Sequence, residues 1–144
     1  MENAPHVVID TNVIFSGLRS KHGASFQVIS LLGSGRFEIH LSVPLVLEHE
    51  EVLSGHKREL DLTTEDNNDF LNYLCEIAYL HDIHFLWRPL LKDPDDEMIL
   101  ELAVAAGCSR IVTYNKSDFD GVDPFGIELV TAKEELLEQI GALP

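Results

Sequence analysis

Residues 7 to 12 read Val-Val-Ile-Asp-Thr-Asn, and this stretch decides the fold class of the chain. Three successive apolar β-branched residues are typical of a strand that is covered on both faces, as in a parallel sheet. A second run of this kind, Ile111-Val112, occurs in the last third of the chain. Five short runs are predicted as strands: His6 to Asp10, Phe37 to Leu41, Ile83 to Trp87, Arg110 to Thr113 and Ile127 to Val130.

Helical patterns lie between these strands. The longest is Thr63 to His81, where Thr63 and Asp66 have the spacing of a capping box and apolar residues recur on one face. The other predicted helices are Gly23 to Leu32, one that opens at Ser42-Val43-Pro44 and ends near Gly55, and one that opens at Thr131. This alternation predicts a single α/β domain over residues 1–144, with three layers (α/β/α) and a mainly parallel sheet of roughly five strands. In such folds ligands bind at the carboxyl ends of the strands, near a topological switch point.

The charge of the chain is strongly negative. It has 25 acidic and 10 basic residues, which give a formal net charge of −15 over 144 residues. This excludes a stand-alone nucleic-acid binder whose affinity comes from a basic surface. A divalent metal bound by clustered carboxylates would reconcile the acidity with a phosphate ligand, because the ion reverses the local sign of the charge. The alternative is that the excess acid keeps the protein in solution.

The apolar runs are short and interrupted by charges, so none approaches the roughly 20 residues that a membrane-spanning helix needs. The opening residues Met-Glu-Asn-Ala-Pro lack the basic and then apolar pattern of a secretory signal. We therefore expect a cytoplasmic protein without a membrane partner.

Asp10 follows directly on the first predicted strand, so its carboxylate is expected at the mouth of the sheet. An acid in this position also occurs as a plain N-cap of the following helix. The residue alone does not decide between a ligand-binding and a capping role.

The predicted helix that follows Pro44 has two candidate acids. Its apolar face contains Leu45 and Leu53, and His49 lies in the middle of that face, where a hydrogen-bonded core histidine is the expected reading. Glu48 and Glu50 lie on opposite borders of the apolar face. Periodicity therefore leaves the choice between these two glutamates open.

Acids also open a later helical pattern. Asp93 has the position of an N-cap and Pro94 that of a first helical residue, so a structural explanation of this cluster is strong. Asp96, however, shares its side of the helix with Ile99 of the core face, whereas Glu97 is expected to turn outward. A half-buried carboxylate at this place is a plausible metal ligand.

Asn115 and Asp118 follow the second buried strand, where they could face the same mouth of the sheet or make ordinary turn hydrogen bonds. Carboxylates thus arrive at one sheet edge from four separate segments. Hard oxygen ligands of this kind select magnesium or manganese.

These residues resemble the PIN-domain nucleases, and in particular the VapC-like toxins of bacterial toxin–antitoxin pairs. Each of the four matching pieces is short, and their order and intervals make the resemblance strong. The pieces, which span Val8 to about Leu136, are Asp10-Thr11-Asn12-Val13, then Ser42-x-Pro44-Leu45-x-x-Glu48, then Asp93-Pro94-x-Asp96-x-x-x-Leu100-x-x-Ala103, and finally Val112-Thr113-x-Asn115-x-x-Asp118-Phe119.

The resemblance implies a sheet between helices and one or two Mg²⁺ or Mn²⁺ ions that serve the hydrolysis of RNA phosphodiester bonds. The four acidic places of the family fall on Asp10, Glu48, Asp96 and Asp118, and this match prefers Glu48 to Glu50. The supporting polar places fall on Thr11, Asn12, Thr113 and Asn115. Many members of the family have an aspartate where this chain has Asn115, so Asp118 must supply that charge.

The resemblance also implies partners. We expect an RNA substrate, a protein antitoxin and a homodimer. The candidate phosphate contacts are Lys116 first, and then Arg19 and Lys21 after the first helix.

Two other functions compete with this hypothesis. A PIN fold that binds RNA or protein without cleaving needs the loss of only one acid, and Asn115 is consistent with such a loss. A receiver-like or phosphatase domain would use Asp10 as a phosphorylated nucleophile. That function needs another acid next to Asp10 or two residues after it, and the chain has Thr11 and Asn12 there.

Overall fold

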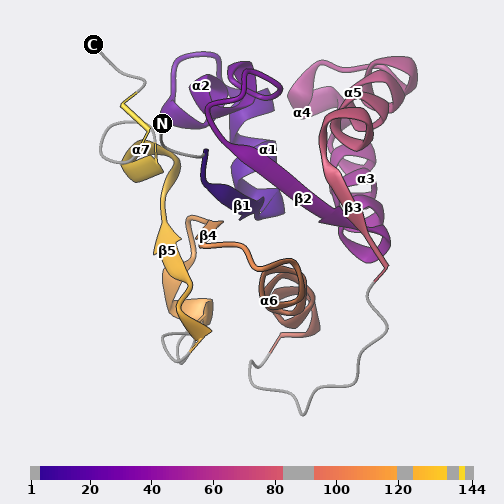
Figure 1. Cartoon of the computed structure of the whole chain (residues 1–144). Coiled ribbons are helices and arrows are strands. Elements are labelled where there is room, and N and C mark those ends of the chain that lie inside the picture. Colours follow the sequence, from indigo (N-terminus) through magenta and orange to yellow (C-terminus); the bar gives the residue numbers. More distant parts are fainter. Residues whose placement is uncertain (1–3, 83–92, 120–124, 136–139, 142–144) are drawn as a thin grey trace.

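The computed structural model describes residues 4–82, 93–119, 125–135 and 140–141, with the side chains of residues 94 and 95 excepted (Figure 1). Five strands form one sheet in the order β3-β2-β1-β4-β5, and every neighbouring pair is parallel. The strands are β1 (His6–Ile9), β2 (Glu38–Ser42), β3 (Tyr79–His81), β4 (Arg110–Val112) and β5 (Glu128–Val130).

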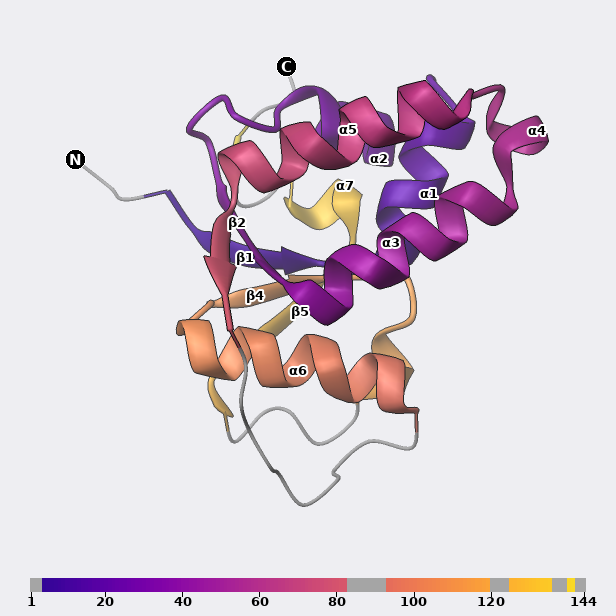
Figure 2. The ribbon, with the colours of Figure 1, turned by 90° about the vertical axis from the view of Figure 1, so that its right-hand side faces the viewer.

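Helices connect the strands and cover both faces of the sheet. Helix α6 lies against one face, whereas α1, α3 and α5 lie over the other (Figure 2). The helices are α1 (Thr11–Arg19), α2 (Ala24–Ser30), α3 (Val43–Gly55), α4 (Lys57–Leu60), α5 (Thr64–Ile77), α6 (Pro94–Ala106) and α7 (Ala132–Glu134), with the 3₁₀ helix η1 (Lys116–Phe119). The predicted three-layer α/β/α class and its parallel five-stranded sheet are confirmed.

The strand order reverses next to β1. From β1 the chain proceeds outward to β2 and β3, and it then returns to place β4 on the other side of β1. The register pairs Val7 with Arg110 and Ile9 with Val112, so both strands end at the same edge of the sheet. This is the topological switch point at which open α/β sheets bind ligands.

The sheet core explains the apolar runs that the sequence shows. Val7 and Val8 of β1 and Ile111 and Val112 of β4 are all fully buried, as expected for strands with helices on both faces. Phe119 of η1 is also fully buried, and it anchors the polar turn that follows β4. Packing in the core therefore fixes the ends of β1 and β4, where the candidate site residues follow.

Local capping signals position two of the helices as predicted. The Thr63 side chain accepts a hydrogen bond from the Asp66 backbone N–H at 3.0 Å, and Asp66 accepts one from the Thr63 N–H at 3.0 Å. Thr131 and Glu134 form the same capping box at the start of α7. These reciprocal bonds satisfy amide groups that the first turn of a helix leaves unpaired.

The prediction for the region after α5 was wrong in part. The predicted helix Thr63 to His81 ends at Ile77, and Tyr79–His81 form β3, which pairs in parallel with His40 to Ser42 of β2. Tertiary pairing with β2 overrides the local helical pattern here. The predicted strand Ile83 to Trp87 lies outside the described residues.

In the part of the chain that the structure describes, no helix is long and apolar enough to cross a membrane.

Candidate active site

A cleft of about 580 Å³ opens where β1 and β4 end. The four acids that the sequence predicted, one from each of four separate segments, all line it. The lining residues are Asp10, Thr11, Asn12, Phe15, Ser16, Arg19, Glu48, Val52, His56, Asp93, Asp96, Tyr114, Asn115 and Asp118.

Asp10 occupies the N-cap position of α1, but its carboxylate makes no capping hydrogen bond. Instead, Oδ2 accepts a hydrogen bond from the Thr113 hydroxyl at 2.8 Å and one from the Asn12 amide at 3.3 Å. The Asp10 backbone N–H donates to the Val112 carbonyl, which continues the pairing of β1 and β4. The Thr113 and Asn12 side chains thus hold the Asp10 carboxylate at the cleft.

Burial raises the pKa of Asp10 above its ordinary value of 3.8, because the charged carboxylate loses its contact with water. The hydrogen bond from Thr113 and the nearby backbone N–H groups of Thr11 and Asn12 oppose this rise. The negative charge of Asp118 raises the pKa further. A cation in the cleft would relieve both the burial cost and this repulsion.

Glu48 is half-buried on α3 and is held by a residue of α1. The Thr11 hydroxyl donates to Glu48 Oε2 at 2.6 Å, and Thr11 Oγ1 also lies 2.8 Å from His49 Nδ1. Because Thr11 has one hydroxyl proton and donates it to Glu48, its oxygen accepts from the Nδ1–H of His49. Burial lowers the pKa of His49 to about 4, so the ring is neutral near pH 7. His49 is the hydrogen-bonded core histidine that the sequence predicted, and it orients Thr11.

The two glutamates that the helical pattern could not separate lie in different surroundings. Glu48 lines the cleft, whereas Glu50 is exposed and lies outside it. The position of Glu48 agrees with the residue that the PIN-domain resemblance preferred, and its role remains a prediction.

Asp96 and Asp93 reach the cleft from the start of α6. Asp96 is half-buried, as expected from its place beside the buried Ile99. The expectation that Glu97 turns outward was wrong, because only 7% of its surface is exposed. The tertiary packing of α6 covers a wider stripe than the sequence pattern indicated.

The turn after β4 brings Asn115 and Asp118 to the cleft. Thr113 is fully buried, and its hydroxyl donates to Asp10 while it accepts from the Asn115 backbone N–H at 3.1 Å. Asp118 is exposed on η1, and its backbone N–H donates to the Asn115 carbonyl. The backbone of this turn is therefore hydrogen-bonded, and Asn115 and Asp118 line the cleft.

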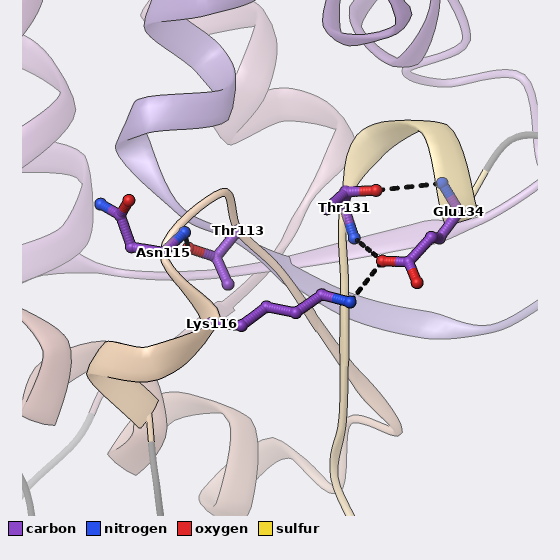
Figure 3. Close-up of polar contacts among 5 residues, drawn as sticks. All are labelled: Thr113, Asn115, Lys116, Thr131 and Glu134. Carbon is purple, nitrogen blue, oxygen red and sulfur yellow. Dashed lines mark hydrogen bonds and ion pairs between the residues drawn. The ribbon is translucent and has the colours of Figure 1, made fainter.

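The three predicted phosphate contacts have different positions. Lys116 does not line the cleft. Its ammonium group pairs with Glu134 at 2.5 Å, and its side chain extends toward α7, away from that of Asn115 (Figure 3). Lys21 is exposed and also outside the cleft lining, whereas Arg19 is part of that lining.

The donor set of the cleft fits a hard divalent cation, because it consists of carboxylate oxygens around the buried Asp10. In the described ranges, Asp10 has no lysine, arginine or histidine within salt-bridge distance. Yet no three His, Cys, Asp or Glu side chains of the described residues are gathered closely enough to hold an ion. The described residues thus include the oxygen ligands that Mg²⁺ or Mn²⁺ prefers, but these ligands are not close enough together to coordinate an ion.

The sequence reasoning did not assign Phe15, Val52 or His56 to the site. Phe15 lies four residues before the predicted Arg19 on α1, and Val52 and His56 are four apart at the end of α3. Residues at this spacing lie next to each other on a helix surface. That signal could have indicated the second group of residues that line this cleft.

A family model described as "PIN domain" matches residues 6–117, which is most of the chain and contains three of the four predicted acids. The comparison with curated proteins found no match. A solved structure described as "Crystal structure of VapBC2 from Rickettsia felis bound to a DNA fragment from their promoter" is 16% identical, with a TM-score of 0.59. The match covers 88% of this chain and 98% of that one, which shows a shared fold. On the family model, the chain belongs to the PIN-domain family.

Proposed function

We propose that this protein is a metal-dependent endoribonuclease that hydrolyses RNA phosphodiester bonds in the cytoplasm. The observation that carries the proposal is that acids from four separate segments line one cleft at the switch point of the sheet. Membership of the PIN-domain family supports it. The acids are Asp10, Glu48, Asp96 and Asp118.

These four acids would hold Mg²⁺ or Mn²⁺, with Asp10 as the central ligand because it is the buried member of the set. When bound, such an ion supplies an activated water near pH 7 and stabilises negative charge on the phosphate. Asn115 is neutral, so Asp118 provides the negative charge at that side of the cleft.

The other polar residues hold the acids in position. Thr113 and Asn12 keep Asp10 directed to the cleft, and Thr11 does the same for Glu48. A hydrogen bond from a neighbouring residue fixes the orientation of a metal ligand, and its loss typically lowers metal affinity by roughly 10- to 100-fold. These three residues act on the reaction through the acids.

A second candidate function is favoured by two observations. Among the residues described, no group of three metal-binding side chains is already assembled, and Asn115 lacks a charge. A PIN fold with this cleft could bind RNA or protein without cleaving either. Metal binding together with a cleavage assay separates the two functions.

We also propose that the protein is the toxin of a toxin–antitoxin pair and forms a homodimer. The structural neighbour is described as VapBC2 bound to a promoter DNA fragment, which supports a search for such a partner. A second cavity, of about 350 Å³, exposes apolar side chains of Val43, Leu47 and Leu80, and surfaces of this kind are often covered by protein. A small DNA-binding protein encoded by the adjacent gene would support the pairing, and the solution mass tests the dimer.

The experiment that tests the enzyme proposal is cleavage of a labelled RNA pool by the purified protein with Mn²⁺, Mg²⁺ or EDTA. We expect cleavage with either metal and none with EDTA. The same preparation is titrated with Mn²⁺ while its melting temperature is recorded, because a ligand that binds the folded state raises that temperature. A rise in melting temperature without cleavage would support the binding function instead.

A further inference from the structure

The cleft has a second wall that contains no acid. It is formed by Phe15 and Arg19 of α1 and by Val52 and His56 at the end of α3. These residues are not needed to hold the metal ligands described above. They do, however, border the same space as Asp10 and Glu48.

Arg19 is held in this wall by an aromatic ring rather than by an acid. Its guanidinium carbon lies 5.4 Å from the centre of the Phe15 ring, which is cation–π distance. Over the described segments, Arg19 has no carboxylate within salt-bridge distance. The chain has 25 acidic and 10 basic residues, and five of the acids line the same cleft as Arg19. Because Arg19 is not paired with any of these five acids, its guanidinium is available to bind an anion.

His56 completes the wall and has a defined tautomer. Its ring meets that of Phe15 edge-on, with centroids 4.9 Å apart and an interplanar angle of 85°. His56 Nδ1 donates a hydrogen bond to the Val52 carbonyl at 2.8 Å. Because a carbonyl can only accept, Nδ1 carries a proton, and Nε2 is the atom left to contact a ligand.

We infer that Phe15, Arg19 and His56 form a phosphate-binding wall for single-stranded RNA, next to the bond that the acids would cleave. This inference rests on the proposed function, and it names the contacts by which so acidic a cleft would hold its substrate. Arg19 binds a backbone phosphate through charge-assisted hydrogen bonds, and His56 Nε2 makes a second contact with the strand. Phe15 is a positioning residue, because it holds the guanidinium and the imidazole in place.

This assignment replaces Lys116 as the main phosphate contact. The Lys116 ammonium is paired with Glu134 outside the cleft, and a phosphate would have to break that pair (Figure 3). Arg19 needs no such exchange, because the Phe15 ring can stay in contact with a guanidinium that also binds phosphate.

The test is binding of a fluorescein-labelled single-stranded RNA, measured by anisotropy in Ca²⁺ buffer, with a gel to verify that the RNA stays intact. Arg19→Gln should raise Kd about tenfold, the loss typical of one charge-assisted contact. It should also make the slope of log K against log salt shallower by about 0.7. The matched control is Arg36→Gln, an exposed arginine just before β2, at the opposite edge of the sheet, which should change Kd less than about twofold.

Two paired substitutions test the positioning role of Phe15 and the contact made by His56. Phe15→Leu should weaken RNA binding, whereas Phe15→Tyr should keep it near the wild-type level, because tyrosine keeps an aromatic ring under Arg19. His56→Asn can keep the hydrogen bond to Val52 but lacks an Nε2 equivalent, whereas His56→Gln places an amide near that position. Binding by the glutamine variant should therefore exceed binding by the asparagine variant.

The failure of this inference is distinct from failure of the proposed function. If wild type cleaves RNA with Mn²⁺ and Arg19→Gln binds as tightly as Arg36→Gln, the wall is not a phosphate site and the inference falls. If wild type binds RNA without cleaving it and Arg19→Gln still weakens binding, the wall stands and the nuclease proposal falls. Binding of a folded partner protein, but not RNA, that is lost in Arg19→Gln would also overturn the inference.

Discussion

At the scale of single residues, Asp10 combines three features that rarely occur together by accident. It follows a buried strand, it is 8% exposed, and its carboxylate makes no capping hydrogen bond although Asp10 occupies the N-cap position. Without a cation, this placement costs free energy of folding, because a buried carboxylate prefers its protonated form. Proteins tolerate such a cost mainly at functional sites.

The substitution Asp10→Asn should abolish metal-dependent cleavage, by at least about a hundredfold, and stabilise the metal-free protein at neutral pH. The folded state raises the pKa of Asp10, so the folded protein binds more protons than the unfolded chain above pH 3.8. The unfolding free energy of wild type therefore falls as pH rises through that window, and the variant lacks this contribution. Denaturant melts at several pH values, in EDTA, measure it.

The same melts with Mn²⁺ provide the control. Metal should raise the melting temperature of wild type and have far less effect on the variant. Equal stabilisation of both proteins would place the metal elsewhere.

At the scale of elements, α3 shows how one helix serves the core and the site together. Its residue Leu45 is fully buried, His49 is 1% exposed, and Glu48 between them reaches the cleft. Ser42 accepts a hydrogen bond from the Leu45 N–H at 3.3 Å and so starts the helix at the end of β2. The rotation of the helix, set at its first turn, decides which glutamate lines the cleft.

Glu48→Gln should remove most of the cleavage activity, and Glu50→Gln should leave most of it. Both changes remove one charge from the same turn of α3, so the pair controls for the net charge and for helix propensity. The reason for the difference is that Glu48 lines the cleft and is held by Thr11, whereas Glu50 is exposed. Initial rates on one RNA measure it, and the reverse order would mean that the assigned face of α3 is wrong.

Helix α5 offers an element whose stability can be changed far from the cleft. Thr63→Ala removes the hydrogen bond that the Thr63 hydroxyl accepts from the Asp66 backbone N–H, and it should lower the unfolding free energy by about 1 kcal/mol. For a chain of this length, that corresponds to a fall in Tm of roughly 3 °C. Cleavage at 25 °C should not change, because none of the described α5 residues lines the cleft. A large loss of activity would indicate that α5 takes part in the site.

At the scale of the whole molecule, the net charge of −15 opposes any contact with RNA. The acids that repel the substrate are also those that would hold a cation, so the molecule is expected to bind RNA only when the local charge at the cleft is reversed. A dimer would double the negative charge as it brings two clefts together.

RNA affinity should therefore depend on the metal and on few cations. Chelation should weaken binding as well as stop cleavage. The slope of log K against log salt should lie between about −1 and −3, because each phosphate contact on a single strand contributes about −0.7. Anisotropy titrations at four salt concentrations, with Ca²⁺ or EDTA, measure both effects. Full affinity in EDTA or a much steeper slope would indicate an extended basic surface. Either result would contradict the prediction that RNA binds through the metal and a few cations.

The sequence by itself determined the class of the fold and the order of most elements, and it predicted four acids that line one cleft in the structure. Apolar β-branched runs such as Val7 to Ile9, and capping boxes such as that of Thr63, express burial and hydrogen bonding within a few residues, and these persist in the fold. The position of β3 was not predictable in this way. Tyr79–His81 becomes a strand because β2 pairs with it, and no local pattern contains that partner.

Only the tertiary structure decided how distant side chains share the cleft. Thr11 and Glu48 are 37 residues apart in the chain, and the sequence pattern left Glu48 and Glu50 equal until the packing of α1 on α3 brought one of them to Thr11. The same packing placed His56 against Phe15, and the approach of η1 to α7 paired Lys116 with Glu134. The physical reason is that periodicity reports which face of an element is buried, whereas the partner of a polar group depends on which elements the strand order makes neighbours.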